Sequence, residues 1–107
     1  MKGTHLGEFE ELVLLTVGIL SGNAYGITVM DEVEEHTGRR ASISTIHTTL
    51  NRLEKKGFVE SYAGASSPVR GGRSKRLYRI NLAGQRALER VRLQREKMWN
   101  LMPKNAF

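Results

Sequence analysis

The stretch SISTIHTTLNRLEKKG, residues 42–57, decides the fold of this 107-residue chain. Ser42 is a favourable helix N-cap and Gly57 a typical stop, so the sequence predicts a helix between them. Apolar residues recur at intervals of three and four, the spacing of one buried helix face, and they are Ile43, Ile46, Leu50 and Leu53. The opposite face is polar, short-chained and cationic, with Ser44, Thr45, Thr48, Asn51, Arg52 and Lys55, and with His47 near its boundary.

Two helices are predicted before this one. From about Glu8 to Leu20, apolar residues occupy nearly every face, a pattern typical of a central helix or of a helix shared with a partner. Turn residues at 21–23 lead to a second helix from about Ala24 to His36, which Thr37-Gly38 ends. The predicted inward residues of the second helix are Tyr25, Val29, Met30 and Val33.

After Gly57 the apolar period changes from helical spacing to two. Residues 58–63 alternate, and after a loop the segment Leu77 to Ile80 supplies a second short strand, so we expect a β-hairpin. Its connection, residues 64–74, is glycine-rich and cationic. The basic residues in and just after this loop are Arg70, Arg73, Lys75 and Arg76.

Asn81 can cap a last helix from about Leu82 to Leu101, before Pro103. At 1.5 Å per residue this helix would be roughly 30 Å long. Its apolar seam consists of Leu88, Val91, Met98 and Met102, with Arg95 in the slot between Val91 and Met98 and Trp99 beside it. A projecting helix of this length needs something to cover its seam.

The net charge of +6 is unevenly distributed along the chain. Residues 1–35 carry one base and seven acids, or −6, whereas residues 36–107 carry sixteen bases and four acids, or +12. A polyanionic partner should therefore meet the second part.

Length and composition exclude several other classes. A chain of 107 residues allows one small domain with at most one appended element. It has no cysteine, which removes disulfides and thiolate chemistry and is consistent with a reducing compartment. The longest apolar run, Leu12 to Leu20, is interrupted and preceded by acids, so we expect neither a signal peptide nor a membrane span but a soluble, cytoplasmic protein.

No chemistry-bearing constellation appears in the sequence. His5, His36 and His47 are far apart and lack paired ligand spacing, so no metal site is expected. A phosphate-binding loop, a dinucleotide fingerprint and a nucleophile motif are also missing. We therefore expect neither an enzyme nor a bound cofactor.

Three helices followed by a hairpin with a basic loop is the element order of a winged helix-turn-helix. The predicted fold class is mainly α with a small β-hairpin, plus a long C-terminal helix. We divide the chain into a winged helix-turn-helix domain, residues 1–80, and a C-terminal helix, residues 81–107. In such a domain the third helix can enter the major groove, roughly 12 Å wide, while the wing lies along the backbone or in the minor groove.

The chain resembles the PadR family of bacterial transcriptional regulators. The resemblance covers about Leu6 to Leu88 and rests on an ordered set of motifs. These are Leu6-Gly7-Glu8-Phe9-Glu10-Glu11-Leu12, Ala24-Tyr25-Gly26, Ser42-Ile43 through Thr49-Leu50-Asn51-Arg52-Leu53-Glu54-Lys55-Lys56-Gly57, Arg70-Gly71-Gly72-Arg73-Ser74-Lys75-Arg76-Leu77-Tyr78-Arg79 and Leu82-Ala83-Gly84.

The resemblance implies a DNA-binding homodimer, usually a repressor, in which the last helix crosses to the other subunit and packs near its first helix. The chain is similar to the short subgroup with a single dimerisation helix. The expected dimerisation residues are Phe9, Leu12, Leu88, Val91, Arg95, Met98, Trp99 and Met102. Some short relatives sense aromatic compounds, so Trp99 is either interface packing or a wall for a small aromatic effector held between subunits. Family members commonly have tyrosine at the position of His47.

The sequence therefore predicts a regulator of double-stranded DNA that binds an inverted-repeat operator as a homodimer. On the third helix, Ser44, Thr45, Thr48 and Asn51 are candidates for base contacts, His47 for a base or a phosphate, and Ser42, Arg52 and Lys55 for phosphate contacts. In the wing, Arg70, Arg73, Lys75 and Arg76 are candidates for backbone or minor-groove contacts. Two other functions stay open: a winged-helix module that docks an acidic protein, and an RNA-binding module that uses the basic wing.

Overall fold

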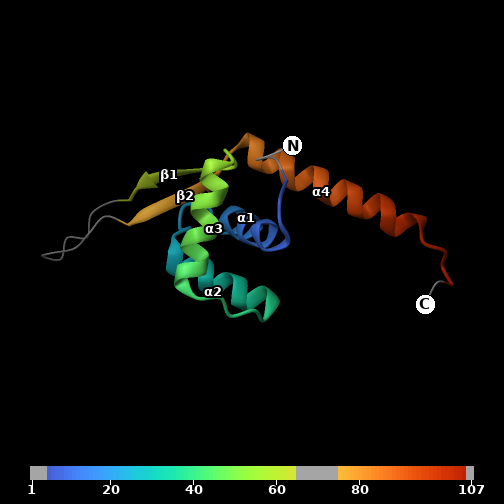
Figure 1. The fold of residues 1–107 in the computed structure, drawn as a ribbon, viewed down its shortest axis with the longest axis horizontal. Helices are drawn as coiled ribbons and strands as arrows, with labels where there is room; N and C mark the ends of the chain where they lie inside the picture. The colour runs from blue at the N-terminus through green and yellow to red at the C-terminus, as the bar shows by residue number, and fades with distance from the viewer. Residues whose placement is uncertain (1–4, 65–74, 106–107) are drawn as a thin grey trace, which may run out of the picture.

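The computed structural model describes residues 5–64 and 75–105 of the chain. These residues form helices and one two-stranded antiparallel hairpin (Figure 1). In chain order the elements are α1 (Glu8–Ile19), α2 (Gly26–Thr37), α3 (Ile43–Lys55), β1 (Val59–Ala63), β2 (Arg76–Ile80) and α4 (Leu82–Leu101). The order confirms the predicted fold class, mainly α with a small hairpin and a long last helix.

The hydrophobic core lies where α1, α2 and α3 meet. Its fully buried aliphatic side chains come from all three helices and are Val13, Leu14, Val17, Val29, Val33, Ile46, Leu50 and Leu53. Each contributes roughly 1.5–3 kcal/mol on burial, so the core holds α3 firmly by one face. The prediction was wrong for Ile43, which is 36% exposed. Ile43 lies in the first turn of α3, against Gly26 at the start of α2.

Two further details of the first helices differ from the sequence pattern. α2 begins at Gly26, because the Tyr25 N–H donates to Thr28 Oγ1 over 3.0 Å and Tyr25 is its N-cap. Tyr25 is therefore half-buried instead of facing the core. On α1, Leu15 and Ile19 are exposed, so a single chain covers only part of the apolar surface of this helix.

The hairpin is fastened to the helices through β2. β1 and β2 pair in a register that runs from Val59 opposite Ile80 to Ala63 opposite Arg76. The N–H of Tyr78 donates to the Ala24 carbonyl over 2.8 Å, and the Tyr78 side chain is buried. This bond ties β2 to the segment just before α2.

α4 begins on the body of the protein and then leaves it. Asn81 Oδ1 caps the helix by accepting from the Gly84 N–H, while Asn81 Nδ2 donates to the Gly57 carbonyl. Gly84 and Ala87 are buried, but the second half of α4 projects away from the core, and its end lies far from the three-helix body (Figure 1). The longest dimension is 62 Å, against 29 and 21 Å for the other two. Among the described residues, no helix has the length and apolar character needed to span a membrane.

Candidate nucleic-acid interface

α3 exposes the polar face that its sequence predicts. Ser42 Oγ accepts from the Thr45 N–H over 3.0 Å and caps the helix, as expected. With Ile46, Leu50 and Leu53 buried, the opposite side of α3 faces solvent. Its exposed residues are Ser44, Thr45, His47, Thr48, Asn51, Arg52 and Lys55. The structure therefore brings all the candidate residues of α3 to one accessible surface.

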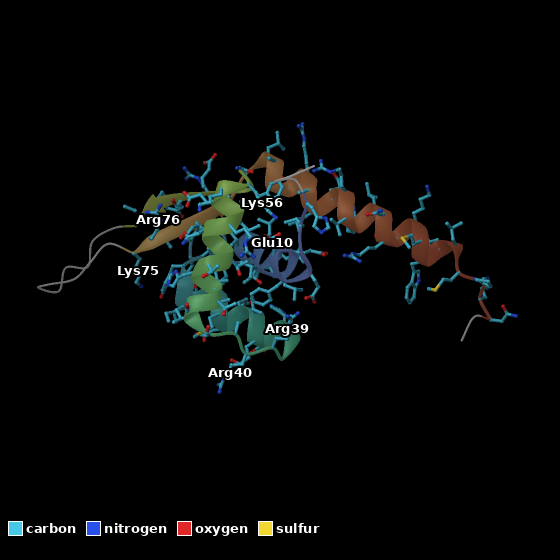
Figure 2. The ribbon with its side chains drawn as sticks, viewed as in Figure 1. Glu10, Arg39, Arg40, Lys56, Lys75 and Arg76 are labelled. Carbon is cyan, nitrogen blue, oxygen red and sulfur yellow. The ribbon has the colours of Figure 1, made fainter. Side chains whose placement is uncertain are left out.

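A groove of about 610 Å³ runs beside this face, between α3, the start of α1 and the turn that joins α2 to α3. Arg39 from that turn is anchored there: its Nη1 donates to both carboxylate oxygens of Glu8, each over 2.8 Å, and its guanidinium lies 5.1 Å from the centroid of the Phe9 ring. The Arg40 side chain is 83% exposed and approaches Glu34 at 3.4 Å (Figure 2). Arg40 is thus the more accessible cation of this turn.

Glu10 links the start of α1 to the end of α3. Its nearly buried carboxylate accepts over 2.7 Å from Lys56 Nζ and over 2.7 Å from the Gly7 N–H, and Arg52 Nε lies 3.9 Å away. Burial alone would raise the pKa of Glu10, but the Lys56 hydrogen bond, the Gly7 hydrogen bond and the charges of Lys56 and Arg52 outweigh it and lower the pKa below its usual value. Glu10 stays ionised and holds α3 against α1.

The loop end of the hairpin carries two further cations, Lys75 just before β2 and Arg76 at the first position of β2 (Figure 2). Lys75 Nζ lies 3.2 Å from Tyr25 Oη and 4.4 Å from the centroid of its ring. Arg76 Nη2 donates to Ser61 Oγ over 2.7 Å and lies 3.7 Å from Glu54 of α3. The other two candidates of the wing, Arg70 and Arg73, lie outside the described residues.

The ring of His47 packs against Gly26 at the start of α2, although the His47 side chain as a whole is exposed to solvent. A Cβ added to Gly26 would come within 2.7 Å of His47 Cε1 and 3.1 Å of Ile43 Cδ1. The absence of a side chain at Gly26 therefore makes room for both residues of α3. This close approach gives a physical reason for glycine in the Ala24-Tyr25-Gly26 motif.

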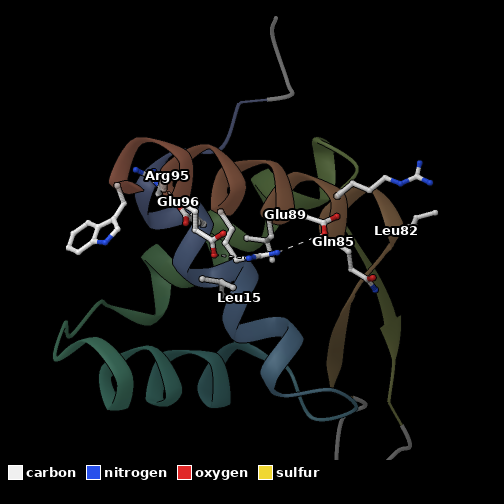
Figure 3. Close-up of a pocket in the computed structure, with 11 residues that line it drawn as sticks. Leu15, Leu82, Gln85, Glu89, Arg95 and Glu96 are labelled. Atoms are coloured by element: carbon white, nitrogen blue, oxygen red, sulfur yellow. Dashed lines mark hydrogen bonds and ion pairs between the residues drawn. The ribbon is translucent and has the colours of Figure 1, made fainter. Parts of the chain in front are cut away.

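A second surface lies between α1 and α4, where a hollow of about 780 Å³ is lined by apolar and charged side chains (Figure 3). Leu88 and Val91 are half-buried against the core, and Arg95 Nη2 approaches Glu11 of the same chain at 3.3 Å. Farther along α4, Met98 is 63% exposed, Trp99 66% and Met102 38%. The two dimerisation candidates on α1, Phe9 and Leu12, are both half-buried. Phe9 lies in the groove beside α3, so the structure does not bring it to the surface between α1 and α4.

Sequence reasoning missed Arg39, Arg40 and Lys56 as parts of this region. The first two are visible in the sequence as a basic pair just before the Ser42 cap, and that pair was the signal available. The partner of Lys56 is Glu10, 46 positions away, which no local pattern reveals. In the described part of the chain, no three histidine or acidic side chains gather as metal ligands would.

Comparisons with known proteins agree on one family. The model of the transcriptional regulator PadR-like family matches residues 14–90. A search of the curated proteins finds no match.

Solved structures share the fold. A PadR family transcription regulator from Clostridium difficile R20291 has a TM-score of 0.70 and 25% identity, over 90% of this chain and 95% of that one. A PadR family regulator from Eggerthella lenta DSM 2243 has a TM-score of 0.67 and 25% identity, over 87% and 80%.

Bacillus subtilis PadR, solved in complex with operator DNA, has a TM-score of 0.63 and 17% identity, over 94% of this chain and 52% of that one. At this identity the match shows that the two proteins share a fold. All these matches are transcription regulators and none is an enzyme. The matched region spans α2, α3, the hairpin and parts of α1 and α4. The chain belongs to the PadR-like family of transcriptional regulators.

Proposed function

We propose that this chain is a cytoplasmic, homodimeric repressor that binds an inverted-repeat DNA operator. α3 reads base edges in the major groove, and the wing contacts the backbone or the minor groove. The observation that carries this proposal is the exposed face of α3, where short polar side chains are flanked by Arg52 and Lys55, with Arg76 of β2 next to the same helix.

The division of labour along this surface follows from side-chain chemistry. Thr48 and Asn51 are short and polar, so they allow the helix backbone to approach base edges and can donate to or accept from them. Lys55, Arg52 and Arg40 carry exposed positive charge that suits phosphates, which position a protein without specifying sequence. The same proposal includes Arg70 and Arg73 of the wing.

The dimer is supported by the projecting end of α4. Met98, Trp99, Leu101 and Met102 all leave apolar surface exposed there, and Leu15 and Ile19 of α1 do the same. A second copy that lays its α4 near α1 would cover both regions, with residues 81–107 as the dimerisation segment. Two copies would then present two α3 helices to half-sites about one helical turn, roughly 34 Å, apart.

The proposal includes a planar aromatic effector held between subunits beside Trp99. Support comes from the hollow between α1 and α4, which combines the apolar Leu15, Leu82 and Leu88 with the charged Glu11 and Arg95. A panel of planar aromatic compounds, followed by tryptophan fluorescence, tests it, because Trp99 is the only tryptophan of the chain. Unchanged fluorescence across the panel contradicts this part of the proposal.

The function is tested by incubating the purified protein with sheared genomic DNA of its host at near-physiological salt and sequencing the retained fragments. We expect enrichment of a few loci that share an inverted repeat. Uniform retention, or a structured RNA that outcompetes the duplex, contradicts sequence-specific DNA binding. A transcription assay on an enriched promoter then distinguishes repression from activation.

A further inference from the structure

A short series of polar contacts joins α3 to both strands of the hairpin. Ser61 Oγ on β1 donates to Glu54 Oε2 on α3 over 2.6 Å. Arg76 Nη2 on β2 donates to the same Ser61 oxygen over 2.7 Å and lies 3.7 Å from Glu54 Oε2. The hydroxyl thus uses its proton toward the carboxylate and a lone pair toward the guanidinium, so one side chain bridges an acid and a base.

The strand register places this series on the inner face of the hairpin. Ser61 pairs directly with the buried Tyr78, and Arg76 precedes Tyr78 by two positions, so the three side chains project to one side. Glu60 and Arg79 pair on the other side, where their side chains approach at 3.4 Å. The two faces of one hairpin therefore each carry an arginine with a carboxylate, but one of these carboxylates comes from α3.

Charge alone would make Glu54 unfavourable next to DNA. A carboxylate beside the polar face of α3 repels phosphates and cancels part of the charge of Arg76. The contacts of Glu54 with Ser61 and Arg76 have a different consequence. They restrict the long side chain of Arg76, which would otherwise sample many rotamers. The Arg76 side chain is still 66% exposed, and the contacts above engage Nη2, so Nε and Nη1 can donate to a phosphate oxygen.

We propose that Glu54 and Ser61 are positioning residues that hold Arg76 in the geometry in which it contacts a DNA phosphate. The inference rests on the proposed DNA-binding function and extends it to two residues outside the contact surface. Because Glu54 belongs to α3, the base of the wing and the groove-reading helix approach DNA in one fixed relation.

Glu54→Gln tests the proposal, with Glu60→Gln as the matched control that removes the same charge from the outer face. The probe is a labelled random-sequence duplex of about 30 base pairs, roughly three helical turns, and its affinity is measured as a function of salt. We expect Arg76→Gln to reduce the magnitude of the log–log salt slope by about 0.9 per chain bound. Glu54→Gln should reduce the slope similarly and weaken binding about threefold to fivefold, although it raises the net charge.

Glu60→Gln should leave the slope unchanged and bind the duplex equally well or more tightly. In the Arg76→Gln background, Glu54→Gln should cause no further loss of slope, because it acts through that arginine. Ser61→Ala, which removes only the bridging hydroxyl, should reproduce the loss, and it serves in place of Glu54→Gln if thermal unfolding shows that the latter does not fold.

The outcomes separate this inference from the function on which it rests. If the unmodified protein binds the duplex but Glu54→Gln tightens binding as Glu60→Gln does, Glu54 is only a repulsive charge and the inference is overturned. An unchanged slope for Arg76→Gln overturns it as well, because Arg76 then makes no phosphate contact. Absence of duplex binding by the unmodified protein refutes the proposed function itself.

Discussion

The ring of His47 on α3 packs against Gly26 at the start of α2, so closely that a Cβ on residue 26 would lie 2.7 Å from His47 Cε1. The atoms that such a Cβ would meet are the ends of side chains, which can move. Gly26→Ala should therefore change the free energy of unfolding by less than about 1 kcal/mol while displacing the His47 ring. We expect altered sequence preference on DNA with a nearly unchanged melting temperature. If DNA preference is unaffected, His47 takes no part in reading the operator.

Gly84→Ala should behave in the opposite way. A Cβ on Gly84 would collide with the Phe58 carbonyl oxygen, which is backbone and cannot swing aside, and would crowd Ile80 Cγ1 as well. We expect a loss of about 2 kcal/mol or more in unfolding free energy, measured by denaturant titration. Gly18→Ala on α1 is the control, since nothing lies within 4 Å of its added Cβ, and it should gain up to about 1 kcal/mol from helix propensity.

Glu10 makes stability depend on pH in the acidic range. Its pKa is lowered in the folded protein, so its contribution is complete above the usual carboxyl value of 4.5 and is lost as the pH falls through the lower folded value. From about pH 5 to about pH 2, the unfolding free energy of the unmodified protein should fall by more than that of the Glu10→Gln variant does over the same range. At neutral pH, Glu10→Gln should itself cost about 1–3 kcal/mol. Glu35→Gln, which removes an exposed carboxylate of α2, is the control and should change the unfolding free energy at neutral pH by less than about 0.5 kcal/mol.

Asn51 and Lys55 lie one turn apart on the exposed face of α3, and we expect opposite signatures from them. Asn51→Ala should lower the affinity ratio between a selected operator and a random duplex by about 1–3 kcal/mol in free energy. Lys55→Ala should weaken both duplexes alike and reduce the magnitude of the salt slope by about 0.9 per chain bound. Competition binding at several salt concentrations measures both quantities. Equal affinity ratios before and after Asn51→Ala would refute its assignment to base contacts.

The two ends of the α4 seam should respond differently to a charge. Met98→Asp places a carboxylate at a site that is 63% exposed in the single chain, so it should dissociate the proposed dimer without disturbing the core. Leu88→Asp should also destabilise each chain by about 2–3 kcal/mol, because Leu88 packs against the core. Sedimentation equilibrium and circular dichroism distinguish the two effects. A Met98→Asp variant that remains dimeric would contradict the proposed role of this seam.

The fold was largely predictable because its signals are local. The predicted bounds of the last helix, Leu82 to Leu101, agree with α4, since an asparagine cap and a following proline mark both ends. Periodicity likewise identified the polar face of α3. Periodicity does not identify the element that each face contacts, however. It predicts that Ile43 is buried, whereas Ile43 is partly exposed and lies against Gly26 of α2.

The contacts that connect elements were not predictable. Arg95 meets Glu11 across 84 positions, and Lys56 meets Glu10 across 46, so neither pair leaves a trace in local spacing. The bridge of Ser61 between Glu54 and Arg76 depends on the hairpin register and on how the hairpin docks on α3. Sequence patterns indicate which residues share an element's face, whereas ion pairs between elements follow from the packing of whole elements.

Because the second half of α4 projects from the core, folding of each chain and the proposed pairing of two chains are separate events. Since the buried core described above lies within one chain, a newly made chain can complete that core before it meets another copy. Pairing of the proposed dimer is then a separate second-order step whose rate and extent depend on how many chains the cell contains. At low abundance the number of DNA-competent molecules would rise with the square of the chain concentration. Occupancy of the operator would then rise more steeply than in direct proportion to the chain concentration.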